Sequence, residues 1–267
     1  MFSGIPFLSS APRVAVVPLS GIIAAGAPGG RGLGDARLAP VLERAFRRGK
    51  PAAVAFAINS PGGSPVQSAL IGARIRRLSE ETKVPALAFV EDVAASGGYW
   101  LAAAADEIFA DAASIVGSIG VIYAGFGFHA LLERNGVERR VHTAGTDKSM
   151  LDPFLPERPE DVERLRHLQG RIHEQFIAHV RARRGTRLSA EEELFTGRFW
   201  DGARALELGL IDGLGHLEPV LRARFGAKTR FVHYGPRRGL LPRIGLDLAA
   251  GALDLAEERA MRAHYGL

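Results

Sequence analysis

The chain has 267 residues, of which 47% are hydrophobic and 24% are charged, so it can bury a substantial core and is not an intrinsically disordered chain. It contains no cysteine, which excludes disulfides, thiolate metal sites and a cysteine nucleophile. The net charge of +5 can attract nucleic acid or anionic lipid, although arginines scattered over solvated faces are the simpler explanation. The densest basic stretch, 181–187, has no interleaved aromatic residue, so we expect no nucleic-acid partner.

The first half of the chain alternates apolar, strand-like runs with segments of helical periodicity. In chain order it predicts strands over 13–19, 52–58, 85–90, 107–110 and 138–143, helices over 38–48, 66–78, 97–104 and 128–135, and a glycine-punctuated β segment over 114–123. Buried strands that alternate with helices form parallel sheets with helices on both faces. The sequence therefore predicts an α/β fold with a mainly parallel sheet.

The second half of the chain is mainly helical in pattern. Apolar residues that recur at three or four positions predict a long amphipathic helix from Pro159 that ends at Gly185, and Ser189 is a suitable cap for the start of another helix. The tail, about 239–267, mixes proline and glycine with an amphipathic segment over 246–261. That segment could contact a membrane or a neighbouring subunit, but we expect it to pack on the protein's own core.

The pattern along the chain has no internal repeat and no clear linker, so we expect one domain over 1–267 with its core at about 13–224. The start of the chain lacks the basic and apolar regions of a secretory signal. The apolar stretches 14–27 and 84–105 are interrupted, and neither offers the roughly 20 apolar residues that a bilayer-crossing helix needs. We therefore expect a protein without a signal peptide or transmembrane anchor, either cytoplasmic or peripherally associated with a membrane.

Ser96 is a candidate nucleophile because of the residues around it. The preceding strand should deliver it to the carboxyl edge of the sheet, and its small neighbours in Ala95-Ser-Gly-Gly98 leave the hydroxyl accessible. The N–H of Gly97 can help to stabilise an oxyanion, and the loop Asn59-Ser-Pro-Gly-Gly63 can present further N–H groups. Taken singly, each of these stretches is better explained as an ordinary small-residue turn or loop.

Lys148 is a candidate general base. The chain has 34 lysines and arginines, and four of these are lysines, at positions 50, 83, 148 and 228. Arginine stays protonated in proteins, whereas a partly buried lysine can lose its proton. A lysine base has to be desolvated, because its ordinary pKa near 10.4 keeps it protonated at neutral pH. A nucleophile, a base and amide donors together meet the requirements of acyl transfer.

Five motifs follow one another along the chain: Ser60-Pro-Gly-Gly63, Ala95-Ser-Gly-Gly-Tyr99, Gly117-Ser-Ile-Gly-Val121, Lys148-Ser-Met-Leu-Asp-Pro-Phe154, and Gly197-Arg-Phe-Trp-Asp-Gly202 with Leu208-Gly-Leu-Ile-Asp212. In this order they resemble the signal peptide peptidase A family, over about 13–224. The members of this family are bacterial Ser-Lys serine peptidases. The resemblance implies a Clp protease/crotonase-like fold and a homo-oligomer that hydrolyses short hydrophobic peptides such as cleaved signal peptides.

Carried over to this sequence, the resemblance implies a role for five residues. Ser96 would be the nucleophile and Lys148 the general base. Ser118 would hydrogen-bond the lysine amine and orient it. The N–H groups of Gly63 and Gly97 would form the oxyanion hole.

The sequence departs from the family pattern in two respects. Asp147 stands where the family more often has an uncharged or aromatic residue, and a carboxylate beside Lys148 favours the charged amine unless the stretch is extended and the two side chains point apart. Many members also carry an N-terminal membrane anchor, and we expect none in this sequence.

Other functions and sites remain open from the residues themselves. A crotonase-like acyl-CoA enzyme on the same fold and a catalytically inactive scaffold are the alternatives to a peptidase. His142 is a disfavoured alternative base. Three further histidines, at 167, 173 and 179, are six residues apart and do not share one helix face, and the sequence has no HExxH motif, so we expect no metal and no cofactor.

Overall fold

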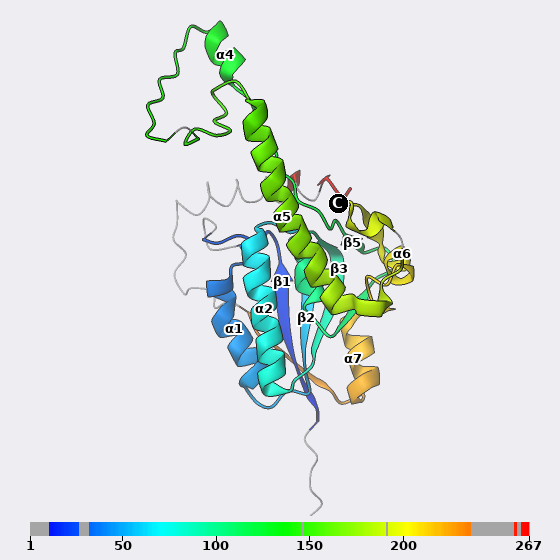
Figure 1. Ribbon diagram of the computed structural model, residues 1–267. Coiled ribbons are helices and arrows are strands. Elements are labelled where there is room, and N and C mark those ends of the chain that lie inside the picture. Colours follow the sequence, from blue (N-terminus) through cyan, green and yellow to red (C-terminus); the bar gives the residue numbers. More distant parts are fainter. Residues whose placement is uncertain are drawn as a thin grey trace, which may run out of the picture. The chain divides into compact units, whose positions relative to one another are not determined.

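The computed structural model describes residues 11–26, 32–145, 147–190, 192–235, 259–260 and 263–266 (Figure 1). Contacts along the chain divide it into two compact units. The first comprises Met1–Ile119 and Ile177–Leu267, and the second comprises Gly120–Phe176. The expected amphipathic segment 246–261 lies outside the described residues, apart from 259 and 260.

The first unit is built on a mainly parallel sheet, as the sequence predicts. Its described strands pair in the order β6-β5-β3-β2-β1-β8, and β4 pairs with β3 and β7. All these ladders are parallel except that between β5 and β6. The strands are β1 (Arg13–Ser20), β2 (Ala53–Ser60), β3 (Ala86–Ala95), β4 (Glu107–Ala110), β5 (Ile115–Gly117), β6 (Phe199–Asp201), β7 (Gly213–Leu214) and β8 (Arg230–His233).

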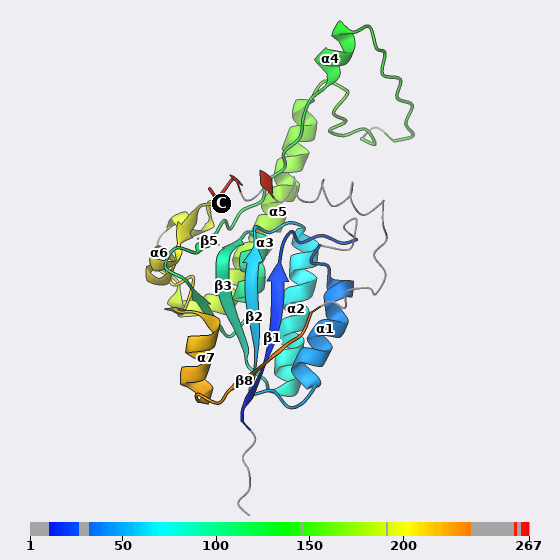
Figure 2. The ribbon, with the colours of Figure 1, turned by 180° about the vertical axis from the view of Figure 1, so that it is seen from behind.

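Helices cover both faces of this sheet. Helices α1 (Asp35–Arg47) and α2 (Pro65–Thr82) lie on the face turned to the viewer in Figure 1, and α7 (Leu217–Phe225) lies on the opposite face, seen in Figure 2. On the α7 face, Leu221 packs in a cluster with alternate strand residues: Val14, Val16, Ala53, Ala55, Leu87 and Phe89. The strict alternation of side chains along a strand divides the apolar residues between the two faces.

The helix α2 begins and ends where its sequence favours a boundary. Ser64 is the N-cap and accepts a hydrogen bond from the Gln67 N–H, and Pro65 occupies the first turn, where a missing N–H does no harm. Lys83 ends the helix in the left-handed conformation, with φ 57°. The buried residues Ile71, Ile75 and Leu78 of α2 form one apolar stripe against the sheet.

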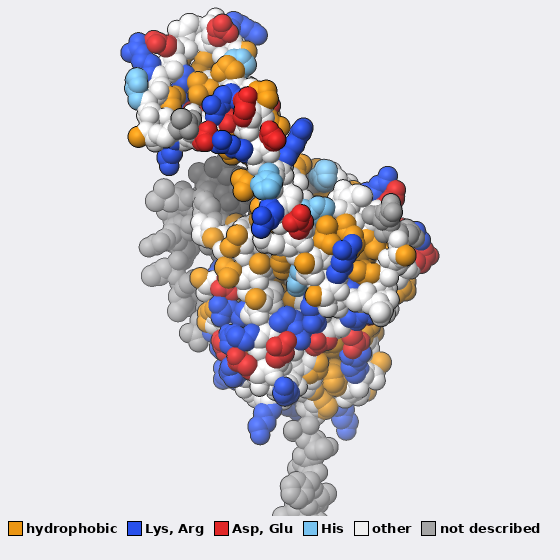
Figure 3. All heavy atoms as spheres, viewed as in Figure 1, with side chains coloured by type: hydrophobic (Ala, Val, Ile, Leu, Met, Phe, Trp, Pro, Cys, Tyr) orange, Lys and Arg blue, Asp and Glu red, His pale blue; other side chains and the backbone are white. Residues whose placement is uncertain are grey.

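Positive charges on the outer surface of α1 and α2 are largely paired. Arg47 bridges Glu43 and Glu81, and Arg77 bridges the same two glutamates. Figure 3 shows the resulting mixture of cationic and anionic side chains on this face. Such exposed pairs contribute little stability, but they prevent a continuous basic surface here.

Three sequence predictions about local structure are wrong. Residues 138–143 form no strand: they are mostly exposed, and within the described chain no strand lies beside them to complete a ladder. The β segment expected over 114–123 is limited to Ile115–Gly117. After Ser189 the chain makes a single 3-10 turn, Glu192–Phe195, instead of a full helix.

Three further helices are α3 (Gly97–Ala103), α5 (Pro159–Arg184) and α6 (Gly202–Glu207). The predicted long amphipathic helix is therefore confirmed, and it ends directly before Gly185. None of the described helices combines the length and the apolarity that a bilayer crossing demands.

The second unit has little buried apolar surface of its own. Its short helix α4 (His129–Arg134) buries none of its residues. The rings of Phe126, Phe128 and Phe154 pack on one another, with Phe128 in the middle, and the Phe128 N–H donates to the Pro153 carbonyl at 2.6 Å. Ile122 and Phe126 remain more than four-fifths exposed. Exposed apolar side chains of this kind are common at contacts between subunits. No partner chain is described, so the expected homo-oligomer stays a prediction.

Candidate functional site

Four of the five predicted site residues lie at one edge of the sheet, where β2, β3 and β5 end side by side. Ser96 follows β3, the loop with Gly63 follows β2, and Ser118 follows β5. The register places Ala95 opposite Gly117 and Ala94 opposite Ser60. Parallel strands bring their carboxyl ends to the same edge, which is where open α/β sheets bind ligands.

Ser96 has an unusual backbone conformation. Its φ of 51° and ψ of −122° lie in a region that residues with a side chain rarely adopt, at the junction of β3 with α3. The surrounding backbone holds it there, since the Ser96 N–H donates to the Gly117 carbonyl at 2.8 Å and the Ser96 carbonyl accepts from the Trp100 N–H at 3.0 Å. A sharp strand-to-helix turn of this type keeps a serine hydroxyl accessible, and Ser96 is only partly buried.

Glycines are required around Ser96 because backbones approach very closely. A Cβ on Gly62 would lie 2.8 Å from the Gly97 nitrogen and 2.9 Å from the Ser96 Cβ. A Cβ on Gly97 would lie 2.4 Å from the Ser68 Oγ, and one on Gly98 would lie 2.3 Å from the Ser60 carbonyl oxygen. The Gly-Gly pairs of the two motifs therefore allow the β2 loop to pack directly against the start of α3.

Two backbone N–H groups beside Ser96 are candidate donors to a ligand. Neither the Gly63 N–H nor the Gly97 N–H has an acceptor among the residues that the structure describes. Gly97 opens α3, where the first N–H groups of a helix have no intrahelical partner. Gly63 is exposed and is held by hydrogen bonds of its two neighbours to Ile23. Their assignment to an oxyanion hole stays a prediction.

Ser118 is held beside this turn by the segment that forms β6. Its φ is 54°, and its N–H donates to the Arg198 carbonyl at 2.7 Å. A Cβ on Gly117 would lie 2.9 Å from the Trp200 ring, so the motif Gly197–Gly202 packs tightly against the end of β5. Residues of that motif thus hold the Ser118 backbone in place.

Tyr265 also contacts Ser118, and the sequence gives no indication of this contact. The Tyr265 hydroxyl lies 3.3 Å from the Ser118 Oγ, and the Tyr265 ring packs edge-on against Phe199 at 4.9 Å. Burial raises the pKa of Tyr265, so its hydroxyl stays protonated at neutral pH. No motif or periodicity marks a residue so near the end of the chain as part of a site.

Lys148 belongs to the second unit, whereas Ser96, Gly63, Gly97 and Ser118 belong to the first. The pairing of Lys148 with Ser96 therefore stays a prediction. Lys148 is exposed, and the part of the chain that the structure describes offers its amine no ion-pair partner.

The residues around Lys148 form successive turns, so the extended conformation considered above is absent. Asp147 is nevertheless engaged elsewhere, since its carboxylate forms an ion pair with Arg164. Asp147 therefore has a counter-charge other than Lys148.

The close approach at Gly62 leads to a first prediction. Gly62→Ala should lower the free energy of unfolding by about 3 kcal/mol, because the new Cβ meets backbone atoms that cannot move independently and because φ is +106°. Gly226→Ala is the matched control, since Gly226 has a similar φ of +99° but open space around it, and it should lose about 1 kcal/mol. Urea unfolding measures both values, and equal losses would contradict the role of the close contact.

Comparisons with known proteins bear on the family and the fold of the chain. The model of peptidase family S49 matches residues 79–226. A solved structure of a mutant of the membrane-bound stomatin-specific protease 1510-N is similar, with a TM-score of 0.54 at 15% identity over 85% of this chain and all of that chain. At this identity the likeness concerns the fold alone, and it confirms the predicted Clp protease/crotonase-like fold.

Two curated relatives illustrate the sequence matches. The protein named Na(+)/H(+) antiporter NhaA of Brucella abortus is 50% identical over 96% of this chain but only 37% of its own length. The putative signal peptide peptidase SppA of Enterococcus faecium is 33% identical over 63% of this chain and 48% of its own length. The chain thus spans between about a third and a half of these relatives. Because the family model covers more than half of the chain, the chain belongs to peptidase family S49, the family of signal peptide peptidase A.

Proposed function

We propose that the chain is a serine endopeptidase that hydrolyses short hydrophobic peptides, such as cleaved signal peptides, with Ser96 as its nucleophile. The observation that carries this proposal is the strained Ser96 turn beside the two N–H groups of Gly63 and Gly97. Membership of a peptidase family supports the same reaction class. A homo-oligomer is part of the proposal, supported by the exposed apolar side chains of the second unit.

The reaction follows from what each group can do. A neutral Lys148 amine removes the proton of the Ser96 hydroxyl as the Oγ attacks the peptide carbonyl. The carbonyl oxygen becomes an oxyanion that the Gly63 and Gly97 N–H groups stabilise, each contributing about 3 kcal/mol to lowering the barrier. Lys148 then protonates the leaving amine, and water hydrolyses the acyl-enzyme. Ser118 orients the lysine amine through a hydrogen bond.

A lysine base requires its surroundings to change before it can act. Lys148 is exposed in its own unit, whereas a lysine that acts as a base has to be desolvated. We infer that Lys148 becomes desolvated when it reaches Ser96, either within one chain or between the chains of an oligomer. The proposal therefore predicts that activity rises with pH as the amine loses its proton.

The experiment that tests the proposal measures hydrolysis of a fluorogenic apolar peptide by the wild type, Lys148→Met and Lys148→Arg between pH 6 and pH 10. Loss of a positioned general base should lower kcat at least about 100-fold in both variants and abolish the rise with pH. Lys228→Met is the matched control, since Lys228 is exposed and belongs to no motif, and it should retain full activity. Full activity of Lys148→Met, or turnover of acyl-CoA thioesters without peptide hydrolysis, would contradict the proposal.

A further inference from the structure

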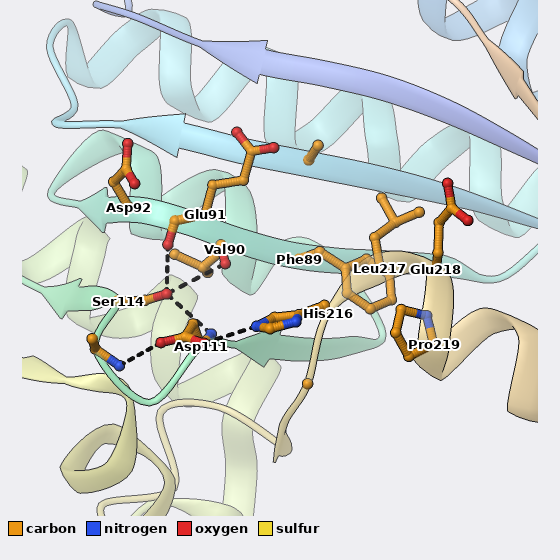
Figure 4. A pocket seen from close by; sticks show the side chains of 13 residues that line it. Phe89, Val90, Glu91, Asp92, Asp111, Ser114, His216, Leu217, Glu218 and Pro219 are labelled. Carbon is orange, nitrogen blue, oxygen red and sulfur yellow. Dashed lines mark hydrogen bonds and ion pairs between the residues drawn. The ribbon is translucent and has the colours of Figure 1, made fainter.

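A cavity of about 680 Å³ lies on the α7 face of the sheet, within the first unit (Figure 4). Its apolar wall is formed by Phe89 and Val90 of β3 together with Leu217 and Pro219 at the start of α7. The volume lies within the usual range of ligand-binding pockets. None of the catalytic steps proposed above uses this cavity.

A bulge in β3 turns two consecutive carboxylates out of the sheet beside this cavity. The β2–β3 register advances from Ile58–Val90 to Ser60–Ala94, so β3 has two more residues than β2 across this interval. Side chains of a regular strand alternate between the faces, but Glu91 and Asp92 are both exposed. Figure 4 shows both extending from β3 at the pocket, and a bulge of this kind redirects side chains.

The cavity is strongly acidic in a chain that is basic as a whole. Glu91, Asp92, Asp111 and Glu218 line it, and its lining contains no lysine or arginine. In the whole chain, by contrast, 34 lysines and arginines outnumber 29 carboxylates. Four carboxylates around one cavity repel anions and attract a cation.

Three of these carboxylates have partners, and the fourth, Glu91, has none among the described residues. Asp111 lies 2.8 Å from the His216 Nε2, Glu218 pairs with Arg222 at 3.1 Å, and Asp92 accepts from the Asn59 amide at 2.7 Å. The Glu91 carboxylate has no ion pair within the described part of the chain. Glu91 is therefore the carboxylate best placed to receive the charge of a ligand.

The arrangement does not suit two other kinds of site. Ser114, His216 and Asp111 lie close together, but the Ser114 Oγ is buried and donates to the Glu91 carbonyl at 2.5 Å, so it is not available as a nucleophile. Across the described residues, no three His, Cys, Asp or Glu side chains are grouped closely enough to hold a metal ion. The cavity thus combines an apolar wall with negative charge but without the ligand set of a cation site.

We propose that this cavity binds a basic and partly apolar peptide segment. The guanidinium of one arginine lies against Glu91 and that of a second arginine lies near Glu218, and a leucine or phenylalanine between them packs on Phe89 and Leu217. A purely apolar peptide would leave the carboxylates uncompensated, and a polyamine would leave the apolar wall exposed to water. A peptide that alternates arginine with an apolar residue matches both features.

The test uses Ser96→Ala protein, so that a bound peptide is not cleaved. A fluorescein-labelled hexapeptide of alternating leucine and arginine is titrated by fluorescence anisotropy, beside its uncharged counterpart with citrulline in place of arginine. The double variant Glu91→Gln with Glu218→Gln should bind the arginine peptide at least about tenfold more weakly, since each carboxylate makes a charge-assisted contact. The wild-type cavity should bind the citrulline peptide at least about tenfold more weakly than the arginine peptide.

The matched control is the double variant Glu80→Gln with Glu207→Gln, which removes two exposed glutamates paired with arginines outside the cavity. It should keep the affinity of the parent protein. Equal binding of the arginine and citrulline peptides, or equal losses in the two double variants, would overturn the proposal. Sedimentation could give a further contrary result. If the parent binds no peptide but self-associates, and the Glu91/Glu218 double variant does not self-associate, the occupant of the cavity is a second copy of the chain and the proposal is overturned. Because binding is measured without turnover, a failure here is separate from a failure of the proposed peptidase activity.

Discussion

Ser96→Ala should abolish peptide hydrolysis, with kcat reduced by about 10⁴-fold or more, because no other group can form the acyl-enzyme. The fold should be unaffected, since the structure shows no hydrogen bond of the Ser96 Oγ to a described residue and the backbone keeps its two hydrogen bonds. The measurement is hydrolysis of a fluorogenic apolar peptide, together with the melting temperature of both proteins. Activity that survives Ser96→Ala would mean that the nucleophile lies elsewhere.

Ser96→Gly adds a test of the strained turn itself. Glycine adopts a φ of 51° with a ψ of −122° at much lower energy than serine, so this variant should be inactive but about 1 kcal/mol more stable than the wild type. Ser96→Ala should show no such gain, because alanine has the same backbone restriction as serine. Inactivity with added stability would show that the protein retains a strained backbone at this position for the sake of its hydroxyl.

Asp212→Asn should lower the free energy of unfolding by about 3–5 kcal/mol, the usual effect of leaving a buried charge without its partner. Arg184 is 2% exposed, and its guanidinium contacts both Asp212 carboxylate oxygens, at 2.7 and 3.1 Å. The same carboxylate accepts the Ile108 N–H at 2.8 Å and a bond from Arg187 at 3.0 Å. Asparagine retains one acceptor but no charge, so Arg184 is left buried without its counter-charge.

Urea unfolding measures this loss, and Glu107→Gln is the matched control. Glu107 pairs with Arg224 at the surface, and exposed pairs contribute at most about 1 kcal/mol. Losses of similar size in the two variants would contradict a special role for the buried pair.

The pH dependence gives this prediction a second readout. Burial by itself raises the pKa of Asp212, but its hydrogen bond with Arg184 and the charges of Arg184 and Arg187 outweigh burial and leave the pKa below its usual value. A carboxyl group whose pKa is lower in the folded state stabilises the fold above its unfolded pKa of about 3.9, and this contribution is lost as the pH falls through the folded pKa. The stability difference between wild type and Asp212→Asn should therefore be full at pH 7 and narrow below about pH 4.

The sequence predicts best the elements whose hydrophobic pattern reflects which of their residues are buried. Apolar runs such as 52–58 are buried strands, and the three- to four-residue period from Pro159 is a helix that ends before Gly185. The sequence wrongly predicts a strand over 138–143. A strand needs a neighbouring strand, and within the described structure these residues have none, which no local pattern in the sequence reveals. The bulge at Glu91 and Asp92 was missed because their polarity suggested that the strand ends before them.

The sequence by itself determined the order of the motifs, and hence the family, the parallel α/β fold and the identity of Ser96 as the candidate nucleophile. Strand polarity explains this success, since a residue that follows a parallel strand must lie at the carboxyl edge of the sheet. Only the tertiary structure decided which groups meet at this edge, Gly62 against Ser96 and Tyr265 against Ser118, and that Arg184 pairs with Asp212 elsewhere in the fold. These contacts join residues far apart in sequence, and their geometry depends on how the chain packs, which no local periodicity or propensity records.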